Sequence, residues 1–194
     1  MVNDRKYSRL VLVSFVVLTS IGNSLSAQEK SAKMDVAAAM KQWKIFYKRK
    51  IGDMFAPIEE WKCVNGGYFD LNKAQGPAII YLGFYGCPPC RQEMPLYAEL
   101  SLEKKYSGYN FVYLTFDDSA TISEELNTAK ISEHKIKLVS LPEKYIRSKG
   151  MANAFPVVYF LDQEKTVKMI HAFGLLSGSL DSINYWHSLL DSLK

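Results

Sequence analysis

The chain has 194 residues, of which 48% are hydrophobic and 13% aromatic, and its formal net charge is +4. That length fits one domain with extensions, and the apolar content supports a packed core and excludes an intrinsically disordered chain. The mild charge, without a basic run, gives no reason to expect a nucleic-acid partner.

The first segment has the pattern of a secretory signal peptide. Three basic residues precede an apolar stretch at residues 10–21, and small residues follow up to Ala27. The apolar stretch is shorter than the roughly 20 residues that a membrane-spanning helix needs. We therefore expect residues 1–27 to be a signal peptide cleaved near Ala27, and the protein to be periplasmic or otherwise exported. An uncleaved signal that anchors the chain in the membrane is the alternative.

A helical extension is expected next, at residues 28–51. Between residues 30 and 48 apolar side chains recur at helical spacing, at Val36, Met40, Trp43 and Tyr47. The stripe covers under two heptads, so it favours a helix packed on its own chain over a dimerisation helix. We expect a monomer or a weak dimer.

Residues 52–194 predict one α/β domain. Strands are expected at residues 58–64, 68–71, 78–84, 111–116, 136–139, 157–161 and 166–172, and helices at 91–106, 121–130, 142–149 and 179–193. Asn65-Gly66-Gly67 indicates a hairpin turn between the first two strands. Thr121 and Glu124 have the spacing of a capping box. This order predicts a central mixed β-sheet flanked by helices.

Two of the three cysteines form the motif Cys87-Pro88-Pro89-Cys90, between a predicted buried strand and a predicted helix. Thiols three positions apart lie on one face of a helical turn, where they are able to form a disulfide or to open one in another protein. The positive end of the helix dipole favours a thiolate at Cys87. The third cysteine, Cys63, is expected to be a small buried residue.

The motif stands within residues 82–95, LGFYGCPPCRQEMP, and a second motif at residues 154–162 reads AFPVVYFLD. These segments resemble the active-site segment and the cis-proline loop of thioredoxin-like proteins, in particular the exported TlpA/ResA-type thiol–disulfide oxidoreductases. The resemblance extends over roughly residues 52–194 and implies a thioredoxin-like fold.

The resemblance also implies roles for individual residues. Cys87 would be the exposed nucleophile that attacks a substrate disulfide, and Cys90 the buried resolving thiol. Glu93 matches an acidic position near the cysteines that helps proton transfer. The residues implied in substrate binding flank the cysteines or form the cis-proline loop: Pro88, Pro89, Phe155 and Pro156.

Three positions depart from the common pattern of the family. Gly86 stands where most relatives have Trp, so one ring beside the thiols is missing. Tyr81 stands where thioredoxin itself has a buried Asp, so proton transfer through that Asp is unavailable and Glu93 gains importance. A third difference is Val157, where Thr or Ser often follows the proline.

Other chemistries fit the sequence less well. Peroxiredoxins place Thr three residues before the catalytic Cys, where this chain has Phe84. Haem attachment needs His after the second cysteine, where Arg91 stands. A zinc site needs further ligands at suitable spacing, and none forms a pair with another: Cys63, His134, His171 and His187. We expect no metal and no cofactor.

The expected function is therefore exchange of disulfides with protein substrates through the Cys-Pro-Pro-Cys pair. The two prolines between the cysteines have no charge and no hydrogen-bond donor that would stabilise the thiolate of a strongly oxidising pair, so a reductant is favoured. An electron donor in the membrane would keep the pair reduced. Two alternatives stay open: a disulfide oxidase or isomerase, and a non-catalytic binding or chaperone-like module that uses the groove near Pro156.

Overall fold

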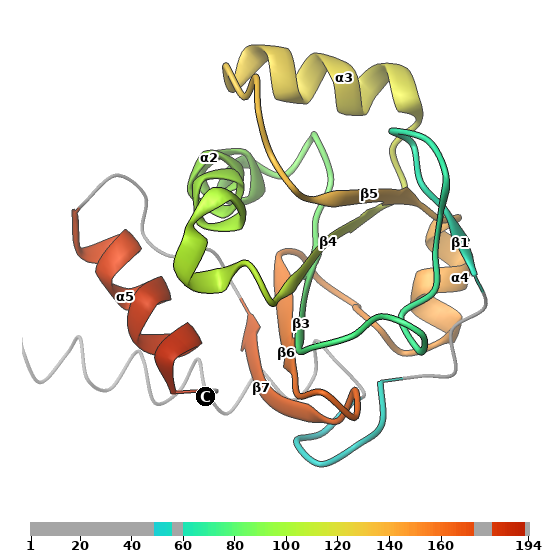
Figure 1. Ribbon diagram of the computed structural model, residues 1–194. Helices are drawn as coiled ribbons and strands as arrows, with labels where there is room; N and C mark the ends of the chain where they lie inside the picture. Colours follow the sequence, from blue (N-terminus) through green and yellow to red (C-terminus); the bar gives the residue numbers. More distant parts are fainter. Residues whose placement is uncertain (1–48, 56–59, 173–179, 193–194) are drawn as a thin grey trace, which may run out of the picture. The chain divides into compact units, whose positions relative to one another are not determined.

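The computed structural model describes residues 49–55, 60–172 and 180–192 (Figure 1). The predicted signal peptide and the predicted helix at residues 30–48 lie outside these residues. Among the described residues, the helices are α2 (Pro88–Leu102), α3 (Ser119–Thr128), α4 (Glu143–Ser148), α5 (Leu180–Asp191) and a short 3₁₀ turn, η1 (Lys104–Tyr106). No helix within them is both long and apolar enough to cross a bilayer.

The main sheet has five strands in the order β5-β4-β3-β6-β7. Strands β3 (Ala78–Leu82), β4 (Asn110–Thr115) and β5 (Lys137–Ser140) run parallel. Strands β6 (Val157–Leu161) and β7 (Val167–Ala172) pair antiparallel on the other side of β3. The predicted mixed sheet is confirmed.

A second, two-stranded sheet pairs β1 (Trp61–Lys62) with β2 (Tyr68–Phe69) in antiparallel register. The predicted glycine turn joins these strands, and both glycines of the turn, Gly66 and Gly67, have positive φ, which glycine adopts without strain. Cys63 follows β1 and bridges to Val139 of β5. It is buried and free, as expected from the sequence.

Side chains alternate along each strand, so the main sheet has two covered faces. In Figure 1, α2 and α5 lie on one side of the sheet, whereas α4 and the β1–β2 hairpin lie on the other. The apolar face, as we call it, carries aliphatic residues of the central strands: Ala78, Ile80, Leu82, Val112, Leu114 and Val157. The opposite face, the tyrosine face, packs against α2, α3 and α5: Ile79, Tyr81, Phe111, Tyr113, Val158 and Phe160.

Helix α3 begins two residues before its predicted start. Asp118 is the N-cap, and its carboxylate accepts a hydrogen bond from the backbone N–H of Thr121 at 2.8 Å. The predicted capping box at Thr121 and Glu124 is therefore wrong. Asp is at least as good an N-cap as Thr, and Asp118 stands three residues before a free N–H of the first turn.

Candidate active site

Cys87 and Cys90 lie where the loop after β3 enters α2. Cys87 is the N-cap of the helix, and its Sγ atom is bonded to that of Cys90, with the two Cα atoms 5.2 Å apart. The first two positions of α2 are Pro88 and Pro89, which have no N–H. The N–H of Cys90 is therefore the first one of the helix, and it points at Cys87 Sγ at 3.3 Å. This N–H and the helix dipole favour a thiolate at Cys87 when the pair is reduced.

The two cysteines differ less in exposure than the sequence predicted. Cys87 was expected to be exposed, but 4% of it is accessible, against 0% of Cys90. Packing of the loop after β3 explains this correction, because Phe84 and Phe155 pack against the core cluster that contains both cysteines. Cys87 remains the more accessible of the two.

The cis-proline loop lies at the same end of the sheet as the cysteines. The peptide bond between Phe155 and Pro156 is cis, as the resemblance implied. Val157, the next residue, pairs antiparallel with Leu82. Pro156 therefore directly precedes β6, at the end of the sheet where β3 ends and the loop to Cys87 begins.

An aromatic cluster of partly exposed rings stands beside this loop. The rings of Phe84 and Phe116 stack with centroids 5.0 Å apart, and Phe155 meets them edge-on at 5.4 and 5.7 Å. A Cβ atom on Gly86 would lie 3.0 Å from the Phe84 ring. A side chain at that position would press on the cluster, so glycine fits the local packing where the proteins that the chain resembles mostly have Trp.

Glu93 is buried on the tyrosine face and is not a solvated helix carboxylate. Its exposed fraction is 1%, and its Oε2 atom accepts a hydrogen bond from the Tyr81 hydroxyl at 2.8 Å. Burial and the charge of Glu93 raise the pKa of Tyr81 well above its usual value, so the hydroxyl stays protonated and donates. Sequence reasoning read Tyr81 as the loss of a buried acid, whereas in the structure it holds the acid that α2 supplies.

The two tyrosines of this face meet Cys90 beside Gly83. A Cβ atom on Gly83 would lie 3.0 Å from Cε1 of Tyr81, 3.1 Å from Cε2 of Tyr113 and 3.2 Å from Sγ of Cys90. Such contacts are tight for any side chain, and glycine leaves room for all three groups. The sulfur of Cys90 and the edges of both tyrosine rings therefore converge on the space that a side chain at Gly83 would occupy.

Sequence reasoning missed a second buried carboxylate, Glu125 of α3. Its exposed fraction is 2%, and its Oε2 atom accepts a hydrogen bond from the Tyr113 hydroxyl at 3.3 Å. Burial, and then the charge of Asp117, raise the pKa of Glu125 to about 7. The signal was present in the sequence, because Ile122, Glu125 and Leu126 share the inward face of the predicted helix.

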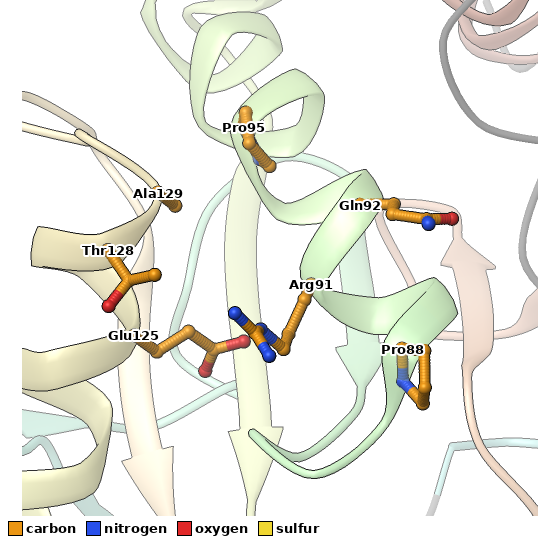
Figure 2. Close-up of a pocket in the computed structure, with 7 residues that line it drawn as sticks. All are labelled: Pro88, Arg91, Gln92, Pro95, Glu125, Thr128 and Ala129. Atoms are coloured by element: carbon orange, nitrogen blue, oxygen red, sulfur yellow. The ribbon is translucent and has the colours of Figure 1, made fainter.

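A pocket of about 310 Å³ lies between α2 and α3. Figure 2 shows that the side chains of Arg91 and Glu125 point toward one another across it. The lining residues are Pro88, Arg91, Gln92, Pro95, Glu125, Thr128 and Ala129.

Two of the histidines considered as metal ligands have contacts away from the Cys87–Cys90 pair. His187 lies 2.8 Å from Glu103, and His171 packs near Tyr185 and Trp186. No group of three His, Cys, Asp or Glu side chains in the described part of the chain has the arrangement of a metal site.

Comparisons with known proteins agree with this geometry. No family model matches the chain. The thioredoxin-like protein YneN of Bacillus subtilis is 29% identical over 119 residues, which cover 60% of this chain and 68% of the relative. A putative thiol:disulfide interchange protein DsbE from Chlorobium tepidum superposes with a TM-score of 0.59 at 19% identity, over 75% of this chain and 99% of the other. A secreted Mycobacterium tuberculosis disulfide oxidoreductase gives 0.55 at 15% identity, over 70% and 96%. The predicted thioredoxin-like fold is confirmed, and so is the resemblance to thiol–disulfide oxidoreductases of this fold.

Proposed function

We propose that this chain, a thioredoxin-like thiol–disulfide oxidoreductase, exchanges disulfides with exported protein substrates through Cys87 and Cys90 and works mainly as a reductant. The observation that carries the proposal is the disulfide between these cysteines at the N-terminus of α2, beside the cis-proline loop. The disulfide is the oxidised form that one cycle of substrate reduction would leave.

The sulfur chemistry runs in two steps. The Cys87 thiolate attacks a substrate disulfide and forms a mixed disulfide, and one substrate sulfur leaves as a thiolate. Cys90 then loses its proton and attacks Cys87 Sγ, which releases the second substrate sulfur and closes the Cys87–Cys90 disulfide. Two electrons have passed to the substrate, and a dithiol donor must return two electrons to the pair. We assign that supply to a membrane partner.

Glu93 is the proposed acceptor of the Cys90 proton. It stands three residues after Cys90 on α2, so both lie on the helix face that packs on the sheet. Tyr81 holds the carboxylate in place, and the Tyr81 ring lies beside the same glycine as Cys90 Sγ. A buried carboxylate within reach of a thiol is suited to general base catalysis.

Substrate binding is assigned to the surface that surrounds Cys87. Pro88 is exposed, Pro89 and Phe155 are partly exposed, and Pro156, directly before β6, is buried. The partly exposed aromatic cluster offers apolar surface next to the backbone of the cis-proline loop. These features suit an extended polypeptide better than a small thiol.

Export is part of the proposal. The signal-peptide pattern of residues 1–27 supports it, and one structural neighbour is described as secreted. Outside the cytosol disulfides persist, so a reductant there depends on a steady electron supply.

The test of this function compares the wild type with two single variants in the reduction of a model protein disulfide by a dithiol. Cys87→Ser should reduce the rate to that of the dithiol alone, because no thiolate remains at the helix N-terminus. Cys63→Ala should keep the rate of the wild type and is the matched control, since it removes the free, buried thiol. Equal activity of Cys87→Ser and the wild type would refute disulfide exchange and favour a binding or chaperone-like role.

The direction of transfer is tested by equilibrium with glutathione. A reducing pair should lie well below the approximately −120 mV of strong oxidants of this fold. A value near −120 mV would show that the protein is an oxidase.

A further inference from the structure

Glu125 is a buried carboxylate that the proposed exchange does not use. Its Oε2 atom accepts one hydrogen bond from Tyr113, while Oε1 is enclosed and has no hydrogen-bond partner among the residues that the structure describes. Burial of a carboxylate with an unpaired oxygen costs free energy. Stability alone therefore does not explain why α3 places a carboxylate here.

Tyr113 connects Glu125 with the redox pair. The hydroxyl end of Tyr113 is at Glu125, and the edge of its ring lies beside Gly83, where Cys90 Sγ also lies. The Tyr81 ring meets the same point, and its hydroxyl donates to Glu93. The ring centroids of the two tyrosines are 5.7 Å apart, so both tyrosine–carboxylate pairs belong to the buried cluster that contains the sulfur.

Two charged groups and one hydroxyl, each from a different segment, act on Glu125. Asp117, in the loop between β4 and α3, raises its pKa, and Arg91 of α2 lowers it from across the pocket between α2 and α3. The hydrogen bond from Tyr113 of β4 also lowers the pKa of Glu125. The charge of Glu125 in turn raises the pKa of Tyr81 of β3. With a pKa of about 7, Glu125 changes its charge in the range in which the exchange would operate.

We propose that Glu125 takes up a proton when the Cys87–Cys90 disulfide is reduced and is a positioning residue that acts on the reduced pair through Tyr113. The inference rests on the disulfide exchange proposed above. Reduction turns a neutral disulfide into a pair that carries a negative charge, with the thiolate at Cys87 and the thiol at Cys90, and this charge repels a negative charge on Glu125. Protonation of Glu125 relieves this repulsion.

The electrons and protons balance as follows. A dithiol donor gives two electrons to the Cys87–Cys90 bond, which breaks, and the donor becomes a disulfide and releases two protons. One proton is taken up by Cys90, the other by Glu125, and Cys87 stays a thiolate. When the pair reduces a substrate, both electrons leave and Glu125 gives its proton back.

The test is the equilibrium between the pair and glutathione from pH 6 to 9, in the wild type and Glu125→Gln. If reduction adds a proton to Glu125, the ratio of the wild-type constant for reduction to that of the variant falls as the pH rises above 7. The slope approaches tenfold per pH unit, or about 30 mV for two electrons, and at least a threefold fall is expected over the range. Glutathione titrates identically in both measurements, so its own thiol cancels.

Two further variants keep the result interpretable. Glu124→Gln removes the exposed neighbouring carboxylate of α3 and should give a flat ratio. Arg91→Gln, at an exposed position, removes the cation that lowers the pKa of Glu125, so the steep interval should move to higher pH. The ratio of the wild-type constant to that of Arg91→Gln shows this shift even if Glu125→Gln does not fold. A flat ratio for Glu125→Gln, or an unmoved interval for Arg91→Gln, with normal exchange in the wild type overturns the inference alone. No exchange in the wild type overturns the proposed function as well.

Discussion

Ile80 and Tyr81 are neighbours on β3, yet they point to opposite faces of the main sheet and to different chemistry. Ile80 packs among aliphatic and aromatic groups of the apolar face. Tyr81 packs on the tyrosine face, where its hydroxyl holds the carboxylate of Glu93 and its ring lies near Cys90. The pairing of β3 with β4 repeats this difference, because Ile80 pairs with Val112 and Tyr81 with Tyr113.

The difference teaches where this fold accepts buried polar groups. Both faces are equally closed to water, since every residue of β3 is buried. Buried carboxylates are found on the tyrosine face alone among the described residues, at Glu93 and Glu125. A buried carboxylate reduces stability unless it is paired. The tyrosine face therefore combines packing with the two buried carboxylates on which the proposed proton chemistry depends, whereas the apolar face contributes packing.

The largest expected effect is a loss of stability from a substitution on the apolar face. Ile80→Ala removes buried methyl groups and leaves a cavity, so the free energy of unfolding should fall by about 2–5 kcal/mol. The equilibrium of the cysteine pair with glutathione should stay within twofold of the wild type. Denaturant unfolding and the glutathione equilibrium measure the two quantities. A large shift of the redox equilibrium would break the proposed division between the faces.

A smaller effect on stability but a specific effect on rate is expected at Glu93. Glu93→Gln keeps the side-chain shape but removes the base, so the rate of the resolving step at neutral pH should fall by roughly 10²-fold. Glu99→Gln is the matched control, because Glu99 is an exposed carboxylate on the same helix. Stopped-flow measurement of mixed-disulfide decay distinguishes them, and equal rates for both variants would leave Glu93 with a structural role only.

The smallest expected effect is the pH dependence of stability that Glu125 confers. Its pKa of about 7 in the folded protein lies above the approximately 4.3 of an unfolded chain. The folded state therefore binds this proton more tightly, and the stabilisation present below about pH 4.3 is lost as the pH rises through 7. Wild type should lose on the order of 1–3 kcal/mol more than Glu125→Gln between pH 4.5 and 8. Parallel stability curves for the two proteins would contradict the raised pKa.

The succession of strands along the chain and the position of the cysteine pair could be predicted from the sequence, because both depend on local patterns. The run at 157–161 coincides with β6, and the other predicted strands that the structure describes agree to within a few residues. Glycine, proline and apolar alternation act over short distances, so they identify turns and strands in a single chain.

The chemistry around the pair could not be predicted in the same way, because it depends on contacts between distant segments. Tyr81 and Glu93 come together only when α2 packs on β3, and Tyr113 and Glu125 only when α3 packs on β4. The burial of Cys87 likewise depends on aromatic rings from the loops after β3 and before β6. Such contacts leave no spacing in the sequence beyond the inward position of the residues on their helices.

The most direct measurement of the central claim is the capture of a mixed disulfide by Cys90→Ser. Without the resolving thiol, the first step should stop at a substrate joined to Cys87. Mass spectrometry of the digested adduct should locate one substrate sulfur on Cys87 and leave Cys63 as a free thiol. An adduct on Cys63, or no adduct although the protein is folded and reduced, would contradict the account.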